Sequence, residues 1–184
     1  MKNKKLKIIL EILMWAAICA ALIVIDQVTK NLVYKNIYYG SSKVLIPKLL
    51  ELSHVHNTGA AWGMFGSHTA VLSAVTILAS GVLVSIMCQT KALSVKIPLI
   101  IVISGALGNL YDRVTRGFVI DFIKVWIFKY EFPNFNFADS CITVGCVLLI
   151  VFILRNSEKG GLFRENTLLW KWFEKRERKP ENDE

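Results

Sequence analysis

The sequence predicts a mainly α-helical, polytopic membrane protein: a four-helix transmembrane bundle with a small extracytoplasmic β-sheet and loop region. Two observations predict this fold class. Hydrophobic residues make up 54% of the 184-residue chain, and its mean hydropathy is +0.47, which sets it apart from ordinary soluble domains. Apolar runs at 8–25, 70–88, 97–111 and 138–154 also approach the length of about 20 helical residues that crosses a hydrocarbon core.

The first run follows a basic start, as in a secretory signal peptide. No small-x-small cleavage motif precedes a mature domain, so we expect an uncleaved first helix. One domain is expected over residues 1–155, with an outer β region at about 35–68. The basic tail at 156–184 mixes Trp with Lys and Arg, which is typical of an interfacial helix, and its last residues are expected to be disordered.

Positive charge orients the predicted helices. Lysines precede the first run, Lys91 and Lys96 separate the second from the third, and a group of Lys and Arg follows the fourth. Because cytoplasmic loops collect positive charge, both termini and the 89–96 loop are expected in the cytoplasm. The longer loops, at about 26–69 and 112–137, then face outward. The net charge of +8 is therefore a topology signal, and it does not indicate nucleic-acid binding.

Residues 50–57 alternate between apolar and polar positions, which predicts a strand in a small sheet on the outer membrane surface. Gly59 follows in a predicted tight turn. His54 and His56 share a face of this strand and could supply half of a metal site. No third ligand is evident, so a surface strand with two polar residues is the preferred interpretation.

The third run ends in polar residues that lipid would leave without hydrogen-bond partners. Such residues must face the bundle interior or a polar cavity. Gly117 then ends the predicted helix and leaves Asp121 in an extended, half-buried segment. Four residues at i, i+4, i+7 and i+8 share one helical face: Gly105, Asn109, Asp112 and Arg113.

Topology brings two aspartates to one rim of the membrane. Asp121 follows the third helix and Asp139 begins the fourth, while Asp26 ends the first helix and Asn57 lies in the outer loop at the same level. Two neighbouring carboxylates in a partly dehydrated site cannot both ionise, so the pair offers one acid and one base. The dipole of the fourth helix favours Asp139 as the ionised partner.

Structural explanations exist for each residue taken singly. Asp112 beside Arg113 suits an ion pair or a helix-end cap, Asp139 suits a helix cap, and Asp26 with Lys30 suits an i, i+4 surface pair. A transporter with an intramembrane polar pathway and a noncatalytic scaffold are alternative functions. The gathering of all these groups at one membrane face favours a reactive site.

Four segments resemble motifs of the lipoprotein signal peptidase family, also called signal peptidase II. They occur in order through most of the chain: DQVTK (26–30), NTGAAWGMF (57–65), GNLYDRVTRGFVIDFI (108–123) and FNFADSCITVG (135–145). The chain departs from the family pattern at Trp62-Gly63, where Phe-Ser is common, and at Tyr111, where a smaller aliphatic residue is usual.

The resemblance implies an intramembrane aspartyl endopeptidase of the bacterial inner membrane. Such enzymes cut prolipoproteins just before a cysteine that carries diacylglycerol. It implies Asp121 and Asp139 as the catalytic pair, with Gly105 leaving room for the peptide. Membrane lipids as partners, inhibition by globomycin-type antibiotics, a monomeric state, and no metal, cofactor or nucleic acid are also expected. The supporting residues implied are Asp26, Lys30, Asn57, Gly59, Gly105, Asn109, Asp112, Arg113, Asn136 and Ala138.

Overall fold

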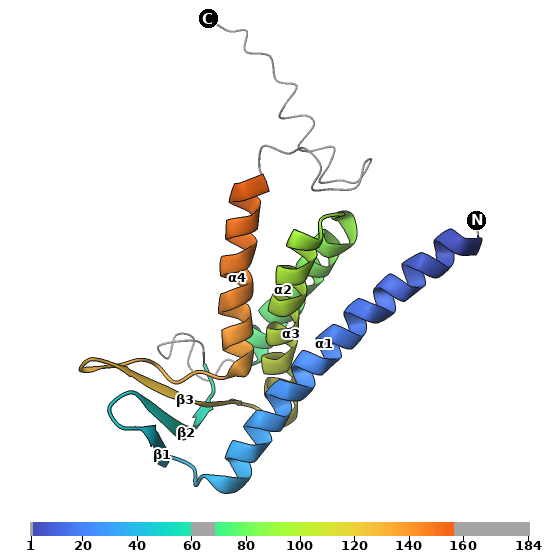
Figure 1. Cartoon of the computed structure of the whole chain (residues 1–184). Helices are drawn as coiled ribbons and strands as arrows, with labels where there is room; N and C mark the ends of the chain where they lie inside the picture. The colour runs from blue at the N-terminus through green and yellow to red at the C-terminus, as the bar shows by residue number, and fades with distance from the viewer. Residues whose placement is uncertain (1, 60–68, 157–184) are drawn as a thin grey trace, which may run out of the picture.

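The computed structural model describes residues 2–59 and 69–156, and the helices form a bundle with the strands gathered at one end (Figure 1). We call that end the sheet end. The predicted tail helix and the Trp62-Gly63 position lie outside the described residues. In chain order the elements are α1 (Lys2–Asn36), β1 (Ser42–Ile46), β2 (Leu50–Asn57), α2 (Thr69–Gln89), α3 (Leu93–Arg116), β3 (Val119–Ile127), β4 (Tyr130–Glu131) and α4 (Phe137–Asn156).

All four helices are long and apolar enough to cross a membrane, as the hydropathy of the sequence predicts. The helix α1 is longer than its apolar run because neither Gly nor Pro interrupts it. The predicted loop boundary at residue 26 is therefore wrong, and Asp26 lies inside α1. The helix α3 ends at Gly117, which adopts the left-handed conformation (φ 81°) and donates its backbone N–H to the carbonyl oxygen of Arg113.

The strands form one antiparallel sheet in the order β1-β2-β3-β4. The strand predicted at 50–57 is confirmed as β2. The other half of the sheet comes from residues 119–131, where the sequence indicated only an extended segment around Asp121. In the pairing of β2 with β3, Val55 lies opposite Asp121 and Asn57 lies opposite Val119. Asn57 and Asp121 therefore lie in the same part of the sheet.

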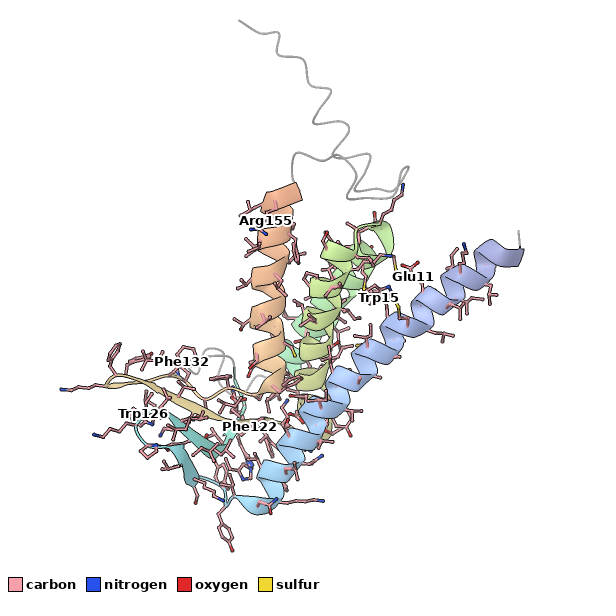
Figure 2. The ribbon with its side chains drawn as sticks, viewed as in Figure 1. Glu11, Trp15, Phe122, Trp126, Phe132 and Arg155 are labelled. Atoms are coloured by element: carbon pink, nitrogen blue, oxygen red, sulfur yellow. The ribbon has the colours of Figure 1, made fainter. Side chains whose placement is uncertain are left out.

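A small apolar core fixes the sheet to the bundle. Val33 of α1 packs with Ile120 and Phe122 of β3, and all three are buried. Figure 2 shows Phe122 at the junction with the helices and Trp126 farther out in the sheet. The last turns of α1 therefore hold the sheet in place, which explains why α1 continues past the apolar run.

The helix α3 is the interior helix of the bundle. In its most apolar stretch 61% of the residues are buried, against 6% in α1, so α1 presents most of its apolar surface to lipid. At the end of the bundle away from the sheet, Lys96 of α3 forms an ion pair with Glu11 of α1. Figure 2 shows Glu11 and Trp15 on the side of α1 that faces the other helices.

Two glycines allow α3 and α4 to approach each other closely. A Cβ atom at Gly105 would lie 2.4 Å from the carbonyl oxygen of Ala138, and one at Gly145 would lie 2.6 Å from Val102 and 3.0 Å from the carbonyl oxygen of Pro98. The space at Gly105 is thus filled by α4, which is a packing role that the family resemblance did not imply.

We expect Gly105→Ala to lower stability by about 1–3 kcal/mol, because a backbone oxygen cannot move aside for the added methyl group. The matched control is Gly81→Ala in α2, where a Cβ atom would meet nothing within 4 Å. The measurement is the thermal unfolding midpoint of both variants in detergent. Equal midpoints for the two variants would contradict the packing role of Gly105.

Candidate functional site

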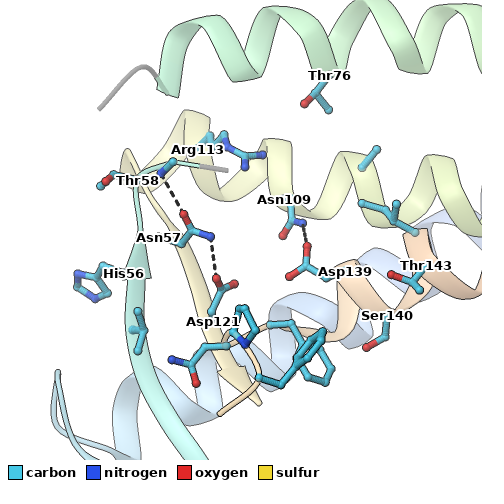
Figure 3. A pocket seen from close by; sticks show the side chains of 18 of the residues that line it. His56, Asn57, Thr58, Thr76, Asn109, Arg113, Asp121, Asp139, Ser140 and Thr143 are labelled. Carbon is cyan, nitrogen blue, oxygen red and sulfur yellow. Dashed lines mark hydrogen bonds between the residues drawn. The ribbon is translucent and has the colours of Figure 1, made fainter. Parts of the chain in front are cut away.

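A cavity of about 960 Å³ lies between the sheet and the helices α2, α3 and α4. Figure 3 shows carboxylate, amide and guanidinium groups gathered at one side of it. The rest of the wall is more apolar and includes Ala106, Ile142 and Val144. The polar lining comprises His56, Asn57, Thr58, Thr76, Asn109, Arg113, Asp121, Asn134, Asp139, Ser140 and Thr143.

Two carboxylates line this cavity, and each oxygen of both accepts a hydrogen bond. Asp121 lies on β3, where its Oδ1 accepts from Nδ2 of Asn136 at 2.7 Å and its Oδ2 from Nδ2 of Asn57 at 2.8 Å. Asp139 lies in the first turn of α4, where its Oδ1 accepts from Nδ2 of Asn109 at 2.8 Å and its Oδ2 from the backbone N–H of Asn136 at 3.1 Å. Amide donors therefore orient both carboxylates.

Asn136 connects the two aspartates and begins α4. Its Oδ1 accepts the backbone N–H of Asp139 at 2.9 Å, while its own N–H donates to the Asp139 carboxylate. This reciprocal pair is a capping box with Asp in the position usually held by Glu. The suggested capping role of Asp139 is thus correct in part, because the same carboxylate also faces the cavity (Figure 3).

Behind the cavity, the ammonium group of Lys30 is buried among three acceptors. Its Nζ lies 2.7 Å from Oδ2 of Asp26, 2.8 Å from Oδ2 of Asp112 and 2.9 Å from Oδ1 of Asn109. Arg116 adds a second cation, 2.9 Å from Oδ1 of Asp112. Two cations thus balance two carboxylates, which a buried ionic cluster requires.

This cluster corrects two expectations. Asp26 and Lys30 are 1% and 0% exposed, so they are not a surface pair. Asp112 does form ion pairs, but with Lys30 and Arg116 and not with its neighbour Arg113. The contribution of Arg116 was missed, although its i, i+4 spacing from Asp112 was a usable signal.

The cluster also orients the cavity through Asn109. Because Oδ1 of Asn109 accepts from Lys30, its Nδ2 must be the atom that faces Asp139. Asp26 connects the cluster to α4 directly, since its Oδ1 accepts a hydrogen bond from the backbone N–H of Ala138 at 3.0 Å. Lys30 therefore positions α1, α3 and α4 around the two cavity aspartates.

Arg113 is the cation of the cavity wall. Its side chain is half-buried and points into the cavity in Figure 3. Within the described part of the chain its Nε has no hydrogen-bond partner. A peptide or ester carbonyl oxygen entering the cavity could accept from such a group.

Burial raises the pKa of Asp121 from 3.8 to about 7, and the nearby negative charge of Asp139 contributes in the same direction. The hydrogen bonds from Asn57 and Asn136 oppose this shift. Near neutral pH, Asp121 therefore exchanges a proton while lying in the same cavity as a second carboxylate, the combination that acid–base chemistry requires.

The two histidines of β2 differ in exposure: His56 is half-buried, and His54 is not a surface residue. His54 is 3% exposed, donates its Nδ1–H to the carbonyl oxygen of Ile37, and lies with its Nε2 3.1 Å from Nε2 of His56. His56 stacks on Phe118, and burial together with His54 lowers its pKa. Among residues 2–59 and 69–156 no group of three or more His, Cys, Asp or Glu is arranged to hold a metal ion.

The structure separates the predicted site residues into three sets. Gly105 packs against α4 and does not line the cavity. Asn57, Gly59, Asn109, Arg113, Asp121 and Asp139 line it. The others lie behind the cavity and support the residues that line it: Asp26, Lys30, Asp112, Asn136 and Ala138. Thr76, Ser140 and Thr143 also line the cavity, and no sequence signal distinguished them from other small polar residues of apolar helices.

Comparison with known proteins links these features to one family. The sequence model described as "Signal peptidase (SPase) II" matches residues 18–155. Lipoprotein signal peptidase of Staphylococcus carnosus (strain TM300) is 38% identical over 145 residues, covering 78% of this chain and 91% of that protein. The protein of the same name from Clostridium acetobutylicum is 38% identical over 143 residues, covering 76% and 93%.

Solved structures are similar over the same region. A structure titled as a bacterial membrane enzyme, solved by the in meso method at 2.3 Å resolution, superposes with a TM-score of 0.73. It is 33% identical in sequence, and the match covers 84% of this chain and 94% of that one.

We expect Lys30→Met to destabilise the protein by about 3–5 kcal/mol, because Asp26 and Asp112 would remain buried with one counter-charge fewer. The matched control is Lys35→Met, at an exposed position of the same helix, with an expected change of about 0.5 kcal/mol or less. Thermal unfolding in detergent measures both. If Lys30→Met unfolds at the temperature of the control, the cluster does not hold the helices together.

A pH-dependent stability is expected from Asp121. Its pKa is raised in the folded state, so between about pH 4 and pH 7 the native protein holds a proton that the unfolded chain has lost, and stability falls as pH rises through this range. Asp121→Asn removes this titration. The thermal unfolding midpoint of the variant minus that of the wild type, measured in detergent, should therefore increase from pH 5 to pH 8. A difference that stays constant over this range would show that Asp121 ionises normally.

Proposed function

This chain belongs to the signal peptidase II family, and on that premise we propose that it is an aspartyl endopeptidase in which Asp121 and Asp139 are the catalytic pair. Family membership makes it a lipoprotein signal peptidase: a multi-pass membrane protease whose substrates are prolipoproteins. We propose in addition its aspartyl catalytic type, its position of cleavage and the roles of individual residues.

One observation carries the proposal: two carboxylates from different elements line one cavity, each fixed on both oxygens by amide donors. With a pKa of about 7, Asp121 carries a proton in a large fraction of the molecules near neutral pH. Asp139 lies in the first turn of α4, at the positive end of the helix dipole. The pair then holds one base and one acid near neutral pH.

In the proposed mechanism the two aspartates hold a water molecule against the scissile carbonyl group. Asp139 accepts a proton from this water as its oxygen attacks the carbonyl carbon, and Asp121 gives its proton to the carbonyl oxygen. The resulting diol collapses as Asp139 passes its proton to the leaving amine nitrogen. Asp121 recovers a proton from the diol hydroxyl group as the new carboxylic acid forms.

Substrate position follows from the two sides of the cavity. The peptide would lie along the polar side, where Arg113 and Asn57 face it, while the diacylglyceryl chains would extend along the apolar wall between the helices. Binding energy from these chains would then support reaction at the peptide bond just before the lipidated cysteine. Gly59 would contribute backbone to the rim, and globomycin-type inhibitors would occupy the same cavity.

The distribution of basic residues supports a single orientation in the bacterial inner membrane. Lys91, Lys96 and the basic residues at both ends of the chain would lie in the cytoplasm. The sheet and the cavity would then face the outer leaflet, where exported prolipoproteins arrive. We expect the monomer to be sufficient, because both aspartates belong to one chain. A transporter site would be expected nearer the bilayer midplane than a cavity bounded by the sheet.

A gel-shift cleavage assay tests the proposal. Purified protein receives a diacylglyceryl-modified prolipoprotein, and in parallel the same precursor without lipid. We expect cleavage of the lipidated form alone, and losses of at least about 100-fold in Asp121→Asn and Asp139→Asn. Glu131→Gln is the matched control, since it removes a carboxylate from the same sheet outside the cavity.

Each result has a distinct meaning. If folded wild-type protein leaves the lipidated precursor intact, the proposed substrate and cleavage are wrong. If either aspartate variant cuts as fast as Glu131→Gln, the peptidase remains but the assignment of the catalytic pair fails.

A further inference from the structure

An apolar surface at the far end of the sheet is not explained by the cavity. It consists of the closed ends of two hairpins, which we call the hairpin tips: residues 45–49, from the end of β1 to the start of β2, and residues 127–130, from the end of β3 to the start of β4. The tips are neighbours, because the backbone N–H of Trp126 donates to the carbonyl oxygen of Leu49 at 2.8 Å. Their large apolar side chains are all exposed: Leu45, Ile46, Leu49, Ile127, Phe128 and Tyr130.

Phe128 is unusual in both exposure and backbone conformation. It is 98% exposed and has a φ of 57°, a region that Gly, Asn and Asp occupy at lower cost than a bulky residue. A turn surrounded only by water gains nothing from phenylalanine at such a position. Exposed apolar groups gathered in this way are typical of an interaction surface.

The charges near the tips fall into two groups. Closer to the bundle, Lys124 forms ion pairs with Glu131 at 3.0 Å and with Glu51 at 4.0 Å. In the tips themselves Lys48 and Lys129 are exposed, and among the described residues neither has an ion-pair partner. The tips therefore combine apolar side chains with uncompensated positive charge, the composition of segments that bind anionic membrane surfaces.

The fold brings the far end of β3 level with the end of a helix that can span the membrane. In Figure 1 the helices α2–α4 run vertically, and β3 extends sideways so that its far end lies at about the height of the first turn of α4. That turn is the start of an apolar span. The connection from β4 to α4 pairs back onto β3, where Phe135 bridges Ile123 and the backbone N–H of Phe132 donates to the carbonyl oxygen of Val125. Backbone hydrogen bonds therefore hold the β3–β4 hairpin at the level where the span of α4 begins.

We propose that the hairpin tips insert into the headgroup layer of the bilayer on the sheet side, with Lys48 and Lys129 contacting anionic phospholipid headgroups. The apolar side chains of the tips enter the boundary between headgroups and acyl chains, as aromatic residues do at membrane interfaces. Because β3 carries both Ile127 and Asp121, this contact sets the height of the Asp121 strand above the membrane. The inference depends only on the multi-pass location, and it goes beyond the proposed peptidase activity.

Quenching by brominated lipids tests the insertion. Full-length Phe128→Trp and Tyr38→Trp are reconstituted in phosphatidylcholine vesicles with and without phosphatidylglycerol, and the emission of the wild-type protein is subtracted. Tyr38 is the control because it is 89% exposed in the connection between α1 and β1, and that connection lies at the bottom of Figure 1, beyond the ends of α2–α4. Lipids brominated on the acyl chains should quench the added emission at least about twofold more strongly at position 128 than at position 38.

Acrylamide in the aqueous phase should show the opposite order. If acrylamide quenches both positions equally and brominated lipid quenches neither, the tips face water and the proposal is overturned. It is equally overturned if quenching at position 128 depends on the protein-to-lipid ratio, since the tips would then meet a second copy of the chain.

The charge contribution has its own variant. Lys48→Gln combined with Lys129→Gln, placed in the Phe128→Trp protein, should abolish the extra lipid quenching that phosphatidylglycerol produces. If that extra quenching persists, the contact with anionic headgroups is wrong. Both readouts are independent of cleavage, so they stand or fall separately from the peptidase assignment.

Discussion

The buried ammonium group of Lys30 is the constraint on which the rest of the structure depends. A cation with 0% exposure is tolerated only when nearby groups neutralise it and accept its hydrogen bonds. Asp26 lies on the same helix, but Asp112 and Asn109 come from α3. The need to place these partners around the Lys30 ammonium group therefore sets the rotation of α1 against α3. The hydrogen bond from the backbone N–H of Ala138 to Asp26 ties α4 to the same cluster.

The same arrangement extends into the cavity through amides. Asn109 and Asn136 each hold a carboxylate of the proposed catalytic pair while contacting each other at 3.2 Å. An amide neither gains nor loses a proton in the physiological range. The donors that position the two carboxylates thus stay the same when either aspartate gains or loses a proton. The geometry of the pair is therefore kept in each protonation state of the proposed reaction.

The helices and the sheet each contribute to the position of this site. Lipid-facing apolar residues on α1, α2 and α4 hold the bundle in the bilayer, while α3 keeps its polar groups inside. The sheet closes the cavity at one end through β3, which carries Asp121 and is fixed to α1 by the packing of Val33, Ile120 and Phe122. The proposed cleavage of lipid-modified substrates would require this position, since one side of the cavity must reach water and the other must reach lipid.

By itself, the sequence determined the four membrane spans, the strand at 50–57, the inward polar face of α3 and the meeting of Asp121 with Asp139. These follow from hydropathy, periodicity and chain order, which are local or topological properties. Only the tertiary structure decided which partners the charges take: Asp112 pairs with Lys30 and Arg116 and not with Arg113, Asp26 and Lys30 are buried, and Gly105 admits α4. It likewise placed β3 beside β2 and buried His54 in an aromatic cluster. Such choices depend on how packed elements are rotated and aligned over long sequence separations, and no local pattern in the sequence records that alignment.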